Sequence, residues 1–460
     1  MKKLNWTEKV AEKISTFDYT QIPSEVVDTV KRAMIDTIAC MIAGTKEDVS
    51  KIVTSFIEEF QDDRPISTVI NKGKYSPEHA ALINGVLAHA IDFDDVNAPT
   101  HGHPSAPILP AALAAAELAE VNGKELIASY VVGVEVMSIL GEVLGLSHYE
   151  KGWHTTTTYG TIGATAAAAK ALSLTKDQTI KALGIATSQT AGSRLNFGTM
   201  MKPYHAGNAA RIGVMSAILA KKGLTSNTSI LEGRMGYFDL YAGEEIKSIA
   251  EIDTIIDSFG KTFRLQTAGI DVKKYPCCYW TVRAADGVLD IVHKESFELD
   301  QIDKVEVIAP SGGLNALIYD RPTTGLQAKF SMEYVVAACL LDKKLNLKSF
   351  EDPSVNRREI TLLEEKVVKW EDPTQSVSAG ANGGNVVVHI KLADGVVFTR
   401  TIESALGSAD LPLTLEQLQE KLEDCISYSK QIGLDAKRII ENILNVEKTD
   451  NARTWSQFLI

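Results

Sequence analysis

Apolar residues recur at helical spacing through most of the first 260 residues. In residues 24–35, apolar side chains stand three and four positions apart, directly after an Ile-Pro-Ser segment that is typical of a helix start. Alanine- and leucine-rich stretches predict further helices at residues 79–91, 106–120, 125–145 and 161–172. This part of the chain is therefore expected to form a layer of closely packed helices.

Prolines and glycines indicate where some of these helices begin or end. Pro107 and Pro110 suit the first turn of the helix predicted at residues 106–120. Pro203 is expected to break any helix near Lys202, because a helix interior loses a hydrogen bond at proline. The sequence Gly-Asn-Ala-Ala at residues 207–210 can then open the next helix.

The pattern changes after about residue 268, where apolar and polar positions begin to alternate. Residues 304–309 alternate like a strand that ends at Pro310. Residues 385–392 and 396–402 alternate as well, and the Asp-Gly pair between them is a strong hairpin signal. Helices are predicted near residues 281–293, 329–342 and from 414 to about 446.

These patterns predict a mainly α fold in two parts. A large all-helical domain, formed by residues 1–268 and 404–460, would contain both termini. A smaller α+β domain at residues 269–403 would lie between the two helical segments.

Composition narrows the function classes. The 460 residues contain 47 Lys and Arg against 59 Asp and Glu, and this net charge of −12 argues against nucleic-acid or membrane-surface partners. Neither a signal peptide nor an unbroken transmembrane run is evident, so a cytoplasmic protein is expected. The five cysteines have no CxxC spacing, which fits a reducing compartment and offers no thiolate set for an iron–sulfur cluster.

The densest group of reactive side chains lies between Asp92 and His103. Three carboxylates and the imidazoles of His101 and His103 fall within twelve residues, and residues 96–116 contain no Asp, Glu, Lys or Arg. Loops between packed helices often carry functional groups. A helix cap at Asp92, a hydrogen-bonded loop histidine and a metal site are the alternatives, although the His-x-His spacing matches no known zinc motif.

Basic segments stand out against the acidic background. Residues 194–211 carry a net charge of +3, with the candidates Arg194, Lys202 and His205. His154 directly precedes an alanine-rich helix, where backbone N–H groups favour an anion. A solvated basic turn and a histidine that only packs are the alternatives.

The second basic segment, residues 261–283, contains five cations against one aspartate, a net charge of +4. Lys273, Lys274 and Cys278 lie at the predicted junction of the two domains, where ligand pockets often form. The alternatives are a solvated linker for the lysines and a small buried side chain for the cysteine. Together, the two basic segments and the Asp/His group favour a small polycarboxylate substrate, with lysines binding carboxylates and a histidine or aspartate moving a proton.

In these segments the chain resembles the MmgE/PrpD family, which includes 2-methylcitrate dehydratase, cis-aconitate decarboxylase and iminodisuccinate epimerase. The resemblance runs in order over almost the whole chain. It is carried by four motifs: His89…Asp92-Phe93-Asp94-Asp95…His101-Gly102-His103-Pro104-Ser105; Gly152-Trp153-His154; Lys202-Pro203-Tyr204-His205-Ala206-Gly207-Asn208-Ala209-Ala210; and Lys273-Lys274-Tyr275-Pro276. It implies a large all-helical domain that contains both termini and a smaller α+β domain that acts as a lid. It also implies a homodimer with a site between the two domains and with neither a cofactor nor a required metal.

The resemblance also implies roles for single residues. The family's active-site residues are similar to Asp92, His103, His154, Lys202 and Lys273. Arg194, His205, Lys274, Cys278 and His101 are expected to bind the substrate. The resulting hypothesis is dehydration of a citrate-like acid, in which His103 or His154 removes a proton next to a carboxylate.

Other reactions on the same fold remain open. The decarboxylase branch of the family has a histidine and a threonine where this chain has Cys278 and Val96, which favours dehydration or epimerisation over decarboxylation. A non-catalytic protein that binds a dicarboxylate on the same scaffold is the alternative from a different class.

Overall fold

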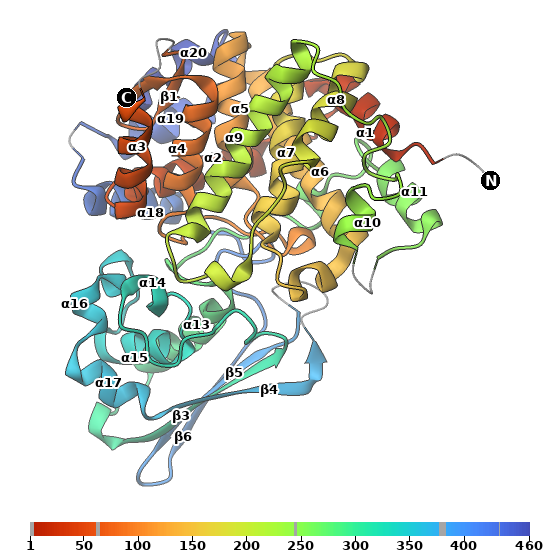
Figure 1. Cartoon of the computed structure of the whole chain (residues 1–460). Coiled ribbons are helices and arrows are strands. Elements are labelled where there is room, and N and C mark those ends of the chain that lie inside the picture. The colour runs from red at the N-terminus through yellow and green to blue at the C-terminus, as the bar shows by residue number, and fades with distance from the viewer. Residues whose placement is uncertain (1–3, 61–64, 243–245, 377–382, 432) are drawn as a thin grey trace.

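The computed structural model describes residues 4–60, 65–242, 246–376, 383–431 and 433–460. A bundle of helices occupies one side of the molecule, and a sheet with its own helices occupies the other (Figure 1). The bundle contains α1 (Trp6–Thr16), α2 (Ser24–Gly44), α3 (Asp48–Glu59), α4 (Pro77–His89), α5 (Ser105–Ala119), α6 (Gly123–Glu150), α7 (Thr155–Ala171), α8 (Lys176–Thr187), α9 (Met201–Lys221), α10 (Tyr237–Tyr241), α11 (Ile249–Asp257), α12 (Arg264–Thr267), α18 (Leu415–Ser429), α19 (Ala436–Leu444) and α20 (Ala452–Trp455). A two-stranded hairpin, β1 (Ser67–Val69) and β2 (Gly73–Tyr75), lies at its edge.

The sheet has the strand order β4-β3-β5-β6. These strands are β3 (Ile302–Ser311), β4 (Val367–Ser376), β5 (Val386–Leu392) and β6 (Val397–Ile402). The β3–β4 pair is parallel, and the other two pairs are antiparallel. Its accompanying helices are α13 (Tyr279–Lys294), α14 (Gly325–Ala328), α15 (Met332–Asp342), α16 (Asp352–Val355) and α17 (Arg358–Glu364).

Two hydrophobic clusters hold these parts together. The larger joins residues 6–272 with residues from α18 to the C-terminal segment, and it contains both Trp6 and Leu459. The smaller consists mainly of residues 275–405 and includes Val96 and Phe197 from the bundle side. The protein is thus mainly α with a small mixed sheet, and the segment around residue 275 is where the chain passes from one cluster to the other.

The long helix α6 is apolar over most of its length. By length and composition it could cross a membrane, but 94% of its apolar window is buried inside the protein. Contacts with α5, α7, α11 and α12 account for this composition.

Several element boundaries differ from those predicted. A helix break at Pro203 and a start at residue 207 were wrong, because α9 runs without interruption from Met201 to Lys221. Pro203 is the third residue of α9, where its missing N–H has no intrahelical acceptor in any case. Gly207 lies inside the helix because α9 crosses α4 closely: a Cβ at Gly207 would lie 2.4 Å from the carbonyl oxygen of Leu82. This crossing brings the last residue of α4, His89, close to Lys202 in the first turn of α9.

Two other element boundaries predicted from prolines, at Pro110 and Pro310, were also wrong. Pro110 is inside α5 rather than in its first turn. The strand β3 continues through Pro310 to Ser311. Beyond Ile308 it pairs with β4 but no longer with β5, so a residue without a backbone N–H is tolerated there. The strand β4 was missed, since its mostly exposed, charged residues do not alternate clearly.

Candidate active site

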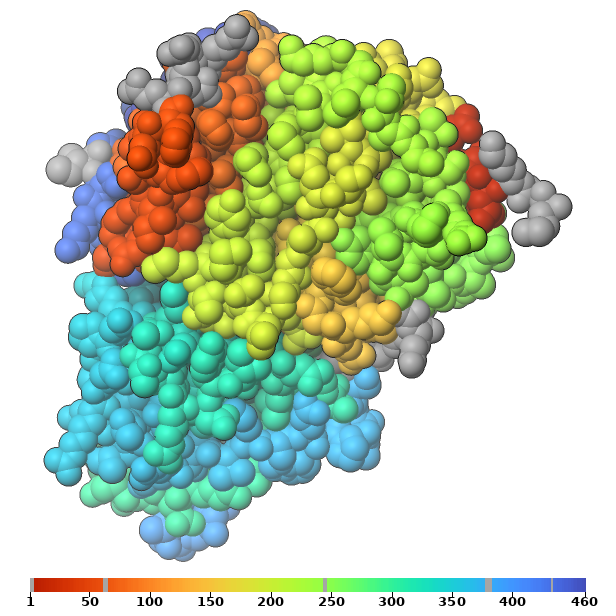
Figure 2. Space-filling view, viewed as in Figure 1, coloured from red at the N-terminus to blue at the C-terminus, as the bar shows by residue number. Residues whose placement is uncertain are grey.

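A small cavity lies where the bundle meets the sheet-containing part. It is lined by the loop between α4 and α5, by the starts of α7 and α9, and by residues 278–280 with Phe330. The two parts meet along a continuous seam in the space-filling view (Figure 2). The cavity has a volume of 60 Å³, which admits a few water molecules.

Asp92 is the charged centre of this cavity. Its Oδ1 atom accepts hydrogen bonds from Lys273 Nζ at 2.6 Å and from Lys202 Nζ at 3.1 Å. Burial by itself would raise the pKa of Asp92, but the two ammonium groups hold it well below the ordinary value. Asp92 has a φ of 51°, a left-handed conformation that is uncommon for a residue other than glycine. The carboxylate is therefore ionised and fixed between two cations.

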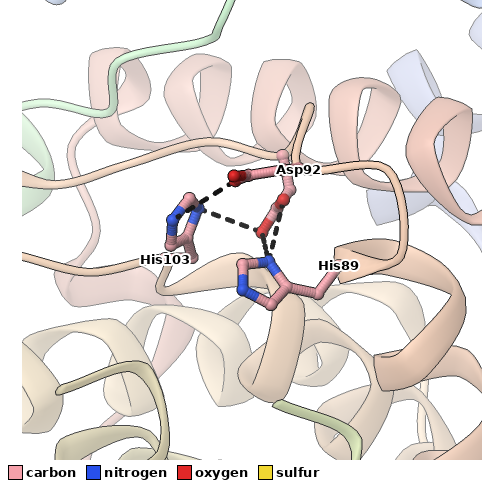
Figure 3. A group of neighbouring side chains, drawn as sticks. His89, Asp92 and His103 are labelled. Carbon is pink, nitrogen blue, oxygen red and sulfur yellow. Dashed lines mark hydrogen bonds and ion pairs between the residues drawn. The ribbon is translucent and has the colours of Figure 1, made fainter. Parts of the chain in front are cut away.

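Asp94 orients two histidines. Its carboxylate lies 2.8 Å from His89 Nδ1 and 3.2 Å from His103 Nδ1. A carboxylate can only accept at these positions, so we assign the proton of each ring to Nδ1, which leaves both Nε2 atoms as acceptors. His89, Asp92 and His103 point toward one another (Figure 3), with His103 Nε2 at 3.8 Å from Asp92 Oδ1.

Both of these histidines are neutral at physiological pH. Burial, together with the charge of Lys202, lowers the pKa of His89 to about 3 despite the opposing effect of Asp94. Burial also lowers the pKa of His103, and the charges of Lys273 and Lys202 act in the same direction. A neutral imidazole with a free Nε2 facing a cavity is suited to act as a general base.

Lys202 links the Asp92 carboxylate to the pair formed by His89 and Asp94. Its Nζ atom lies 2.9 Å from His89 Nε2, and because that nitrogen is an acceptor, the lysine donates. Burial lowers the pKa of Lys202, although Asp92 opposes the shift. The ammonium also lies 5.4 Å from the ring centres of Phe197 and Phe330. Lys202 is therefore a cation that can give up a proton more readily than an exposed lysine.

His154 and His205 form a second imidazole pair beside the cavity. His154 is the N-cap residue of α7, and its Nδ1 atom lies 3.2 Å from His205 Nδ1. Burial and the charge of Lys202 lower the pKa of His154 well below its ordinary value and that of His205 to about 4. His154 Nε2 is buried and has no hydrogen-bond partner in the described part of the chain. This nitrogen is available to a ligand in the cavity.

The structure brings most of the predicted site residues together. Those that line the cavity are Asp92, His101, His103, His154, Lys202 and Cys278. Lys273 lies directly behind Asp92 with a fully buried side chain, and it is paired with that carboxylate, not exposed to a ligand. Burial raises the pKa of the Cys278 thiol to about 11, so it is protonated at neutral pH.

Arg194 and Lys274 do not line the cavity. The Arg194 guanidinium stacks on the Tyr149 ring at 3.6 Å and donates to the carbonyl oxygens of Tyr149 and Asn315, so it braces the cavity wall from outside. Lys274 is half-buried beyond Lys273. The net charge of a sequence segment could not distinguish Arg194 and Lys274, which do not line the cavity, from Lys202, which does.

Two central residues, His89 and Asp94, were not among the predicted site residues. Both belong to the segment whose acids and histidines predict a site, but only the fold shows that the end of α4 lies beside His103.

A metal ion is the competing occupant of this cluster. His89, Asp92, Asp94 and His103 each offer a ligand atom, and these atoms lie within 4.8 Å of one another. However, the Lys202 ammonium already engages His89 Nε2 and Asp92 Oδ1, and Lys273 engages Asp92 again. A divalent cation at this point would face two ammonium groups, so the donor set fits lysine better than a metal.

Two models of one protein family together match most of the chain. The profile of the MmgE/PrpD N-terminal domain matches residues 8–249, and that of the MmgE/PrpD C-terminal domain matches residues 275–446. The chain belongs to the MmgE/PrpD family. The boundary between the two matches falls close to the junction that carries Lys273.

Curated relatives include two kinds of enzyme. The chain is 28% identical to a cis-aconitate decarboxylase of Homo sapiens, over 98% of this chain and 94% of the relative. It is 27% identical to a cis-aconitate decarboxylase of Aspergillus terreus, over 90% of this chain and 88% of the relative. It is 24% identical to a 2-methylcitrate dehydratase of Salmonella typhimurium, over 79% of this chain and 78% of the relative. These MmgE/PrpD relatives are lyases, and their names divide between decarboxylation and dehydration.

Proposed function

We propose that this MmgE/PrpD protein is a lyase that acts without a cofactor on a citrate-like polycarboxylate, and that its reaction is dehydration. The observation that carries the proposal is the Asp94–His103 pair, which presents a neutral Nε2 to a buried cavity next to a lysine ammonium. Removal of a proton next to a carboxylate requires such a base, and departure of hydroxide from the neighbouring carbon requires a proton donor.

In this mechanism His103 Nε2 takes the proton from the carbon next to a substrate carboxylate. The imidazolium that forms is stabilised by Asp94, which is ionised because the two histidines hold its pKa well below the ordinary value against the effect of burial. The electron pair left on carbon expels hydroxide from the adjacent carbon, and a proton from Lys202 converts it to water. Asp92 holds Lys202 in place, and its own charge is balanced by Lys273.

Substrate carboxylates have two places to bind. The unpartnered His154 Nε2 lies at the N-terminus of α7, where backbone N–H groups and the helix dipole favour an anion. Lys202 provides a cation on the opposite side of the same cavity. Because 60 Å³ is far less than the roughly 300–1,000 Å³ of typical ligand pockets, entry of a tricarboxylate requires the two parts to separate at the seam.

Decarboxylation of cis-aconitate is the second candidate, and the similarity to decarboxylases over 98% of the chain favours it. In decarboxylation the carbon that loses CO2 must be protonated, so the reaction depends on a proton donor more than on a base. The pKa values of His103 and His154, which line the cavity, and of His89 and His205, which lie beside it, are all lowered, so these imidazoles are poor proton donors. Val96 and Cys278, the two positions that depart from the decarboxylase pattern, both line the cavity. These features support dehydration over decarboxylation.

The deciding experiment is NMR of the purified protein in D2O with methylcitrate, citrate, cis-aconitate and an iminodiacid. Loss of water from a hydroxy acid is the expected result. Release of CO2 from cis-aconitate would show that the reaction is decarboxylation and not dehydration. Deuterium exchange without net loss of the acid would indicate epimerisation. Binding of citrate that survives His103→Ala and His154→Ala, without turnover in the wild type, would indicate a binding protein.

A further inference from the structure

Three lysines converge on the backbone of the loop that carries Asp92. The carbonyl oxygens of residues 91, 92 and 93 accept hydrogen bonds from Lys329 at 2.7 Å, Lys273 at 2.8 Å and Lys421 at 2.8 Å, respectively. All three side chains are buried. Three consecutive carbonyl groups thus each receive a different ammonium group, and the three lysines are separated widely in sequence.

Each lysine is itself held in place by a second contact. Lys329 also donates to the carbonyl oxygen of Pro276 at 2.7 Å, and Lys421 donates to that of Lys273 at 2.9 Å and pairs with Asp36 of α2. Lys273 donates a second time to the Asp92 carboxylate at 2.6 Å. The loop is therefore tied to the junction segment, to α18 and to α2 at once.

Such an arrangement has a physical cost that needs an explanation. Burying an ammonium group is unfavourable unless it is fully hydrogen-bonded, and a non-glycine residue in the left-handed conformation is strained. Among the described residues, no carboxylate lies within ion-pair distance of Lys329. Strained backbone persists where surrounding contacts over-determine it, typically at functional sites. The three lysines supply those contacts at Asp92, whose φ is 51°.

We propose that Lys329 and Lys421 are positioning residues, which act with Lys273 to hold the left-handed turn that points the Asp92 carboxylate at Lys202. This inference rests on the proposed function, since Asp92 and Lys202 act there on the substrate. On this loop Lys329 donates to the Ile91 carbonyl, whereas Lys421 donates to the Phe93 carbonyl and also lies over the Phe93 ring, 3.6 Å from its centre. Neither lysine is within hydrogen-bond reach of the Asp92 carboxylate, so they affect the reaction through the orientation of Asp92.

Lys329 has an additional effect because it belongs to the sheet-containing part. Its own carbonyl oxygen accepts from the N–H of Cys278, which lines the cavity, and its neighbours Ala328 and Phe330 are in the smaller hydrophobic cluster. The hydrogen bond from Lys329 to the Ile91 carbonyl therefore forms only when the sheet-containing part is in contact with the helical bundle. Of the three lysine contacts with the loop, the one from Lys329 is therefore the contact that depends on closure of the seam.

A second cavity gives experimental access to this contact. Lys329, Ala90 and Ile91 line a 530 Å³ cavity on the seam, whose other walls include Tyr428 and Phe350. The cavity lined by Asp92 and His103 does not include Lys329. A small alkylammonium ion can therefore reach the place of a truncated Lys329 side chain without passing through the candidate active site.

The test uses the full-length protein with Lys329→Ala and Lys329→Met, assayed on the acid that the wild type turns over. We expect kcat to fall by about 100-fold, as for a misplaced catalytic group, while KM changes by less than about threefold. Methylammonium or ethylammonium should restore at least part of kcat in Lys329→Ala but not in Lys329→Met, whose side chain fills the space. Lys366→Ala is the matched control, because Lys366 also donates to a backbone carbonyl in the sheet-containing part, that of Ile302.

Hydrogen exchange provides a readout that does not depend on turnover. Amides of residues 92–97 should exchange at least tenfold faster in both Lys329 variants than in the wild type or in Lys366→Ala. A kcat within twofold of the wild type together with unchanged exchange would overturn the proposal, as would a loss of kcat that no amine restores and that leaves exchange unchanged. If the wild type turned over no acid in the panel, the proposed function would fail, and exchange of residues 92–97 would decide the positioning role by itself.

Discussion

The ammonium group of Lys273 lies 2.6 Å from Oδ1 of Asp92 and 2.8 Å from the carbonyl oxygen of the same residue. The Lys273 side chain is 0% exposed, so no ligand in the cavity touches it without displacing Asp92. Burial alone would lower the pKa of Lys273, but Asp92 and Asp94 raise it above the ordinary value. Lys273 is a permanent cation that fixes the position and the charge of Asp92.

Removal of Lys273 is expected to affect both stability and turnover. Lys273→Met leaves a buried carboxylate with one cation fewer, and breaking such a pair typically costs about 3–5 kcal/mol. Because the lysine does not face the ligand, kcat should fall far more than KM rises. Urea unfolding and steady-state kinetics measure the two effects. The double variant Asp92→Asn/Lys273→Met, which removes both charges, should regain stability but not activity, and a Lys273→Met enzyme with normal kcat would contradict this role.

Asp94 and Asp95 are neighbours in sequence whose pKa values are shifted in opposite directions. The two histidines lower the pKa of Asp94 well below its ordinary value against the effect of burial, whereas burial raises the pKa of Asp95 well above its ordinary value. Burial thus favours the neutral form of Asp95, which is hydrogen-bonded to the N–H and hydroxyl of Ser105. An asparagine can replace the neutral form of Asp95 as a hydrogen-bonding group. At position 94 an asparagine would lack the negative charge that stabilises an imidazolium, and it would have one acceptor oxygen where His89 Nδ1 now lies 3.0 Å and 2.8 Å from the two oxygens of Asp94.

We therefore expect Asp94→Asn to reduce kcat by about 10²- to 10⁴-fold, as when a histidine loses the carboxylate that sets its tautomer. Asp95→Asn should stay within about threefold of the wild type, because it preserves a neutral hydrogen-bonding group. Kinetics of the two variants under identical conditions make the comparison. Equal losses in both variants would show that the segment acts only through packing.

The site illustrates what could and could not be predicted from the sequence. Asp92, His103, His154 and Lys202 were identified from clusters of acids, imidazoles and cations, and all four line one cavity. The same criterion also selected Arg194, which stacks on Tyr149 and does not line the cavity, because the charge of a segment does not determine where a side chain lies.

The contributions of distant lysines were not predictable in this way. Lys329 and Lys421 lie in segments without any unusual charge, and their contact with residues 91–93 depends on how the two parts pack. Helical periodicity predicted most of the bundle, but the start of α9 was misplaced because a proline in a first turn was taken for a break. The strand β4 lacked a clear alternation, since it lies at the sheet edge and Val367 is its one buried residue.

The pH dependence of turnover follows from the neutral state of His103. Burial lowers the pKa of His103 below 6.5, and protonation of this base stops the reaction only once the pH falls below that lowered value. Burial likewise lowers the pKa of Lys202 below 10.5, and loss of its proton removes the acid as the pH rises. A plot of kcat/KM against pH should therefore be bell-shaped, with an acidic limb centred below 6.5 and an alkaline limb centred below 10.5. An acidic limb centred at or above 6.5 would argue against His103 as the base.

The close crossing of α4 and α9 links the fold to the chemistry at Gly207. A methyl group there would lie 2.4 Å from the carbonyl oxygen of Leu82, so Gly207→Ala must push the two helices apart. Overpacking of this kind costs about 1–3 kcal/mol, and it would lengthen the 2.9 Å contact between His89 and Lys202 beyond hydrogen-bond reach. We expect a large loss of kcat together with a modest loss of stability. Ile212→Val on the same helix should cost about 0.5–1.5 kcal/mol without forcing the helices apart, and should keep its activity. If both variants lost activity in proportion to their stability, measured by urea unfolding and kinetics at the same temperature, the spacing of α4 and α9 would have no specific part in the reaction.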